Sequence, residues 1–121
     1  MPFRTILEEL VERVPGARAA VLADWEGESV AAYTSGEGTD YDIKFIGAHH
    51  GIILDHARQV LAELHLGQAR EISFVQEQFH VLTAPVNSEY YVVLTLSPDA
   101  PLGRARFELR QALNQLKKEI E

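Results

Sequence analysis

Residues 42–64 constrain the fold more than any other stretch, because a helix there is apolar on two faces. At about 100° per residue, one continuous apolar side predicts contact with the protein's own core. On nearly the opposite side Phe45 and Ile52 lie one above the other, flanked by His49 and His56. A chain folded alone leaves that second face in water. The core-facing side consists of Ile43, Ile46, Gly47, His50, Ile53, Leu54, Ala57, Val60, Leu61 and Leu64.

Phe45 and Ile52 together indicate a partner surface. Single exposed apolar side chains are ordinary, whereas an aromatic and an aliphatic residue stacked on one helix form a patch. Either another segment of the same chain or a second copy of the protein covers such a patch. The helix pattern suggests self-association and leaves both arrangements open.

Length and composition limit the class of protein. The 121 residues suffice for one packed domain, residues 1–121, and are too few for two. Cysteine is absent, which excludes disulfides, thiolate metal sites and a cysteine nucleophile. The net charge of −7 disfavours nucleic acid as a partner, since phosphate binding requires a positive surface. No window reaches the roughly 18 apolar residues of a membrane helix, so we expect a cytoplasmic protein without membrane insertion.

Periodicity and turn signals predict eight elements in a fixed order. Apolar residues at helical spacing mark the helices, whereas β-branched and aromatic runs mark the strands. Pro15 and Gly16 end the first helix, and Gly27 supplies the turn of a hairpin between the first two strands. The expected helices cover residues 3–14, 42–64 and 102–120, and the expected strands cover residues 17–24, 28–34, 71–77, 79–86 and 90–96.

These elements predict an α/β fold, in the broad sense, of order α-β-β-α-β-β-β-α. Each layer has an apolar face to bury, so we expect a five-stranded antiparallel sheet with the long central helix on one face and the terminal helices on the other. The strand at residues 71–77 alternates, with Ile72 and Phe74 on one face and Ser73 and Val75 on the other.

The sequence indicates no catalytic centre. It has no phosphate-binding glycine motif, and adjacent His49 and His50 point about 100° apart on a helix, so they cannot share one metal ion. We expect His50 to be buried with one nitrogen hydrogen-bonded. Ser73 and His80 are the best pair for nucleophilic chemistry, and we interpret them as solvated strand residues. We therefore expect no cofactor, no metal and no enzymatic activity.

The last helix is basic in an otherwise acidic chain. The helix dipole stabilises Lys117 and Lys118 in the final turn. It does not stabilise Arg104, which lies in the first turn. Two roles remain open for Arg104: an ion pair with an acid of the first helix, or contact with an acidic partner.

Three segments resemble the Roadblock superfamily of dynein light chains and bacterial gliding-type GTPase regulators. Residues 14–17 (Val-Pro-Gly-Ala) and 21–27 (Val-Leu-Ala-Asp-Trp-Glu-Gly) resemble that family's opening helix end, first strand and Asp-x-x-Gly hairpin. Residues 101–110 resemble the start of its last helix, where a Leu-Gly pair precedes a basic, apolar helix. The likeness extends over residues 6–120.

This resemblance implies a homodimer in which the central helices pack together and the third strands pair antiparallel, giving one sheet across two subunits. The helix-face pattern independently indicates the helix contact. The implied interface residues are Phe45, His49, Ile52 and His56 on the helix, and Ser73 and Val75 at the paired strand.

The resemblance also implies that the partner is a small Ras-like GTPase and that the protein is its non-catalytic regulator, in bacteria commonly an activator of hydrolysis. That branch is thought to reposition the GTPase's own catalytic groups rather than insert an arginine finger, so Arg104 is assigned partner contact and no catalytic role. One alternative is a structural adaptor dimer with no effect on nucleotide turnover. Another is a ligand-sensing domain, although no convergent polar pocket is visible in the sequence.

Overall fold

The computed structural model describes residues 2–36, 38 and 40–121, which form three helices and five strands in the predicted order. Each predicted bound lies within two residues of the observed one. The helices are α1 (Pro2–Arg13), α2 (Asp40–Glu63) and α3 (Leu102–Ile120), and the strands are β1 (Ala17–Asp24), β2 (Ser29–Thr34), β3 (Ile72–Val75), β4 (His80–Pro85) and β5 (Tyr90–Leu96). Among the described helices, none combines the length and apolarity needed to cross a membrane.

All five strands form one antiparallel sheet in the order β2-β1-β5-β4-β3, so β2 and β3 are its edges. The β1–β2 hairpin agrees with the sequence prediction, and β3, β4 and β5 form an antiparallel meander. The pairing of β1 with β5 joins these two units, and it brings Ala20 opposite Leu94 in the middle of the sheet.

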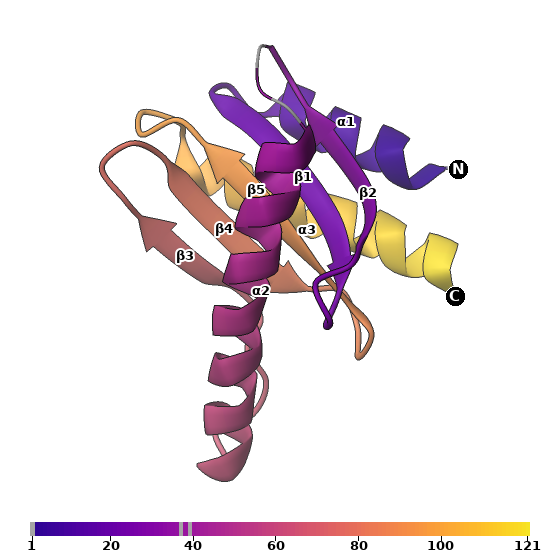
Figure 1. Ribbon diagram of the computed structural model, residues 1–121, viewed down its shortest axis with the longest axis vertical. Helices are drawn as coiled ribbons and strands as arrows, with labels where there is room; N and C mark the ends of the chain where they lie inside the picture. Colours follow the sequence, from indigo (N-terminus) through magenta and orange to yellow (C-terminus); the bar gives the residue numbers. More distant parts are fainter. Residues whose placement is uncertain (1, 37, 39) are drawn as a thin grey trace.

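Helices cover both faces of the sheet, as predicted: α2 lies on one face, and α1 and α3 lie together on the other (Figure 1). The alternation of β1 explains how one strand serves two cores. Ala20 and Leu22 pack on the side of α1 and α3. Ala19, Val21 and Ala23 pack on the side of α2.

Two glycines allow α2 to lie directly on the sheet. A Cβ atom at Gly47 would lie 2.6 Å from Val21 Cγ1, and a Cβ atom at Gly51 would overlap the Tyr91 hydroxyl group. That hydroxyl donates a hydrogen bond to the Gly47 carbonyl oxygen at 3.1 Å, and the Tyr91 ring contacts Trp25 at a centroid distance of 4.9 Å. Burial raises the pKa of Tyr91 to about 12, so the hydroxyl remains a donor at neutral pH. This contact fixes where α2 crosses the sheet.

The second half of α2 extends beyond the sheet (Figure 1). Ile43 and Leu54 are buried as predicted. Ile53, Val60 and Leu64 are 47%, 37% and 60% exposed, although they belong to the predicted core-facing side. The prediction of one continuous buried stripe is therefore wrong for this half, because the sheet ends before the helix does.

We expect Gly51→Ala to lower the free energy of unfolding by about 1–3 kcal/mol, the usual cost of overpacking a tight core contact. Gly103→Ala in α3 is the matched control, because a Cβ atom there meets no atom within 4 Å and alanine favours a helix over glycine. Urea unfolding measures both variants. A Gly51→Ala protein as stable as the unaltered one would contradict the close crossing of α2 and Tyr91.

Candidate interaction surface

Exposed apolar side chains gather on one side of α2 and just after its end. We call Phe45, Ile52, Ile53, Val60 and Leu64 the α2 apolar surface; on a helix they fall within about a third of the circumference. Phe45 is 55% exposed and Ile52 is 70% exposed. More than half of the surface of each residue is therefore exposed.

The two predicted interface histidines are exposed on α2. The His49 ring packs against the Phe45 ring at a centroid distance of 4.4 Å, and His49 Nδ1 lies 3.0 Å from the Phe45 carbonyl oxygen, within hydrogen-bond distance. This contact holds the two rings together in the first turns of α2. His56 lies further along the same side of the helix.

Strand β3 is an open edge beside α2, since it pairs with β4 alone among the described strands. Its alternation agrees with the prediction: Ile72 and Phe74 pack towards α2, whereas Ser73 and Val75 are exposed, Val75 by 70%. Edge strands carry unpaired backbone groups that accept another strand. The predicted dimer residues of α2 and β3 therefore lie on uncovered parts of the molecule.

The structure does not assemble the nucleophilic pair that the sequence offered. Ser73 lies opposite Leu82 in the β3–β4 register, whereas His80 lies opposite Val75. The Thr83 hydroxyl donates a hydrogen bond to the Ile72 carbonyl oxygen at 3.3 Å. Among the described residues, no three His, Asp or Glu side chains lie close enough together to bind a metal ion.

Arg104 forms an ion pair with Glu108 of its own helix at 3.3 Å, so the first of its two open roles, a pair with an acid of the first helix, is wrong. Its side chain is still 54% exposed. The residue that ties α3 to the β3 edge is Arg106, whose Nε donates to Glu71 at 2.7 Å and whose Nη2 donates to Ser73 Oγ at 3.4 Å. Sequence reasoning missed this role, because Glu71 and Arg106 are 35 positions apart and share no local pattern.

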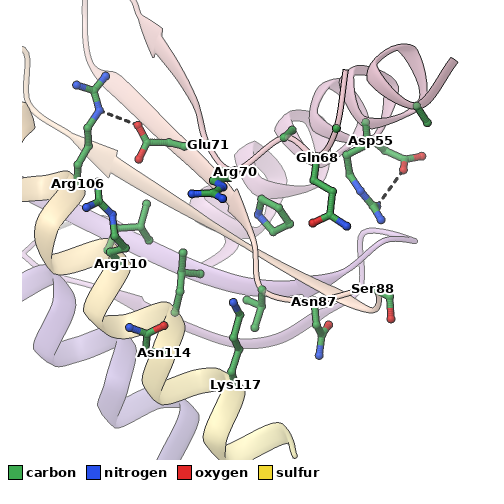
Figure 2. Close-up of a pocket in the computed structure, with 18 of the residues that line it drawn as sticks. Asp55, Gln68, Arg70, Glu71, Asn87, Ser88, Arg106, Arg110, Asn114 and Lys117 are labelled. Atoms are coloured by element: carbon green, nitrogen blue, oxygen red, sulfur yellow. Dashed lines mark hydrogen bonds and ion pairs between the residues drawn. The ribbon is translucent and has the colours of Figure 1, made fainter. Parts of the chain in front are cut away.

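A groove of about 1150 Å³ opens where α2 leaves the sheet (Figure 2). We call it the α2–α3 groove. Its walls are the second half of α2, residues 67–71, the turn between β4 and β5, and α3. No local sequence pattern indicates such a pocket, because its walls come from four separate parts of the chain.

His50 lies on the buried side of α2, as predicted, with its ring edge-to-face against Phe74 at a centroid distance of 4.6 Å. Burial lowers the pKa of His50, and neighbouring His49 shifts it in the same direction. Its Nδ1 is buried with no hydrogen-bond partner in the described part of the chain, so Nδ1 does not make the hydrogen bond that we expected. The fold therefore favours a neutral imidazole at this position.

Sequence comparison finds no matching family model and no matching curated protein. Structure comparison finds a Roadblock/LC7 domain from Streptomyces avermitilis, with a TM-score of 0.86 and 14% identity over 97% of this chain and 96% of that one. MglB in a tetrameric arrangement has a TM-score of 0.84 and 18% identity over 96% and 85% of the two chains. MglC from Myxococcus xanthus has a TM-score of 0.71 and 28% identity over 98% and 99%.

These likenesses define the class: the chain has the Roadblock fold, which confirms the resemblance of its three sequence segments. Within that fold its structural neighbours include the bacterial proteins MglB and MglC.

We expect the stability of the protein to depend on pH through His50. Since the folded state disfavours the charged imidazole, the unfolded state binds a proton more readily below about pH 6.5, the ordinary histidine pKa. The contribution to stability is present above that pH and is lost as the pH falls towards the lowered pKa. The Tm should therefore fall more between about pH 7 and pH 5 in the unaltered protein than in His50→Leu. His65→Asn, which removes an exposed histidine, should behave like the unaltered protein; an equal fall in all three would contradict the prediction.

Proposed function

We propose that the protein is a homodimer that binds and regulates a small Ras-like GTPase and supplies no catalytic residue of its own. The observation that carries the proposal is the α2 apolar surface next to the open β3 edge, in a chain with the Roadblock fold. The likeness to MglB in a tetrameric arrangement supports self-association, since that relative assembles with the same fold.

In the proposed dimer the α2 helices of two copies pack together and their β3 strands pair antiparallel. Phe45, His49, Ile52 and His56 form the helix contact, and Ser73 and Val75 flank the strand contact. Stable interfaces bury about 1,200–2,000 Å² in total, which is more than one stacked pair of side chains supplies. The exposed side chains of Ile53, Val60 and Leu64 add apolar area next to that pair. A second copy removes all of these apolar groups from water.

The regulatory role rests on the resemblance of the sequence segments to gliding-type GTPase regulators, supported by the structural likeness to MglB and MglC. Arg104 is the proposed partner contact, because its side chain is exposed and pairs only with Glu108 among the described acids. Its Nε donates to Glu108, whose side chain is only 11% exposed. The Nη groups of the same guanidinium can contact a carboxylate of the partner while that pair stays in place.

We expect the protein in molar excess to accelerate GTP hydrolysis by the Ras-like GTPase encoded nearest its gene, measured as phosphate release. Binding without acceleration would assign the adaptor role instead. The absence of both binding and acceleration would contradict the proposed function.

Arg104→Ala should weaken the binding in the same assay. Arg13→Ala is the control, because Arg13 of α1 is 52% exposed and pairs with Glu9 at 3.6 Å with the same i,i+4 spacing. If both variants bind as the unaltered protein does, then Arg104 is not the contact.

A further inference from the structure

The α2–α3 groove concentrates positive charge in an acidic protein. Five cationic side chains line it, against the carboxylates of Asp55 and Glu71, although the whole chain has a net charge of −7. Each carboxylate is already engaged, Asp55 with Arg58 at 3.3 Å and Glu71 with Arg106 at 2.7 Å. Both pairs flank the groove in Figure 2. The remaining cations are Arg70, Arg110 and Lys117.

These three cations have no carboxylate within ion-pair distance in the described part of the chain. Arg70 comes from the segment that leads into β3, whereas Arg110 and Lys117 come from α3, so they approach the groove from two sides (Figure 2). The charge of Arg106, one turn before Arg110, is balanced by Glu71. Three positive charges therefore remain along the groove, where an anionic partner can pair with them.

The groove has an apolar floor as well as a basic rim. Leu109 and Val86 are buried beneath it, and Leu113 and Pro85 are half-buried in its wall. The amides of Asn114, Gln68 and Asn87 also line it and supply neutral hydrogen-bonding groups. A site of this composition suits a ligand that carries carboxylates together with an apolar side chain.

The spacing of the cations selects among anionic ligands. Arg110 and Lys117 are seven positions apart on α3, which is about 10 Å along the helix axis. One phosphate group requires donors that converge on a few ångströms, whereas an extended peptide segment of about four residues spans this distance. We propose that the α2–α3 groove binds an acidic, extended segment of a partner protein, with carboxylates on Arg70, Arg110 and Lys117 and an apolar side chain on the Leu113 wall.

This site adjoins the proposed dimer contact along α2. Of its α2 residues, Arg58 lies about 120° around the helix from Ile52, whereas Gln59 lies about 20° from it. The proposal requires neither the dimer nor the GTPase, so it can fail while the proposed function holds.

The test is fluorescence anisotropy with a labelled peptide that alternates glutamate and leucine, and with a control peptide that carries glutamine in place of glutamate. We expect binding of the glutamate peptide that weakens as salt is raised, and much weaker binding of the glutamine peptide. Arg110→Glu and Lys117→Glu should each weaken the binding by about tenfold, since each removes a charge-assisted hydrogen bond and adds repulsion. Lys118→Glu is the matched control, because Lys118 lies next to Lys117, outside the groove, and the change in net charge is identical.

Unchanged binding in Lys118→Glu, with loss in the other two variants, supports the groove. Equal loss in all three variants would overturn the proposal, because it would show attraction by total charge alone. Equal binding of the glutamine peptide, or tighter binding of a single-stranded oligonucleotide, would overturn it as well. Circular dichroism of each variant shows whether a loss of binding reflects unfolding.

Discussion

The contact between Tyr91 and the glycine face of α2 determines the arrangement of the other parts of the molecule. Gly47 and Gly51 are one helical turn apart, so they present one smooth strip to the sheet. Tyr91 fills that strip and donates its hydroxyl group to the Gly47 carbonyl oxygen. Because this contact lies in the first half of α2, the helix is anchored at one end, and its second half extends past the sheet.

The projecting half of α2 generates both surfaces that we interpret as functional. One side presents the α2 apolar surface, which water solvates poorly and which a second copy would bury. The adjacent side forms a wall of the α2–α3 groove, where Arg58 is held by Asp55 and by the Trp25 ring, 3.8 Å from its guanidinium carbon. Trp25 also contacts Tyr91, so the anchoring contact and the groove wall are physically continuous. A shift of α2 on the sheet would therefore alter both surfaces.

The sequence predicts the elements and much of the candidate surface, because periodicity reports which side of each element is apolar. Phe45 and Ile52 are identified as exposed for this reason. Periodicity does not predict the projection of α2. It places Ile53 and Val60 on the core-facing side of the helix, but it does not report that the sheet ends before these residues. The lengths of the elements indicate that α2 extends past the sheet. The 24 residues of α2 span about 36 Å, whereas the longest strand, with eight residues, spans about 26 Å. The groove and the Arg106–Glu71 pair depend on tertiary contacts between distant segments, which no local pattern reports.

Self-association through α2 is the central claim, and sedimentation velocity of Ile52→Asp tests it most directly. The unaltered protein should sediment as a dimer. Ile52→Asp should sediment as a folded monomer or aggregate, because an unpaired charge buried in the helix contact costs several kcal/mol. Phe107→Asp, which places the same charge on a 52% exposed aromatic residue of α3, should remain a dimer. A well-folded Ile52→Asp dimer would contradict the claim.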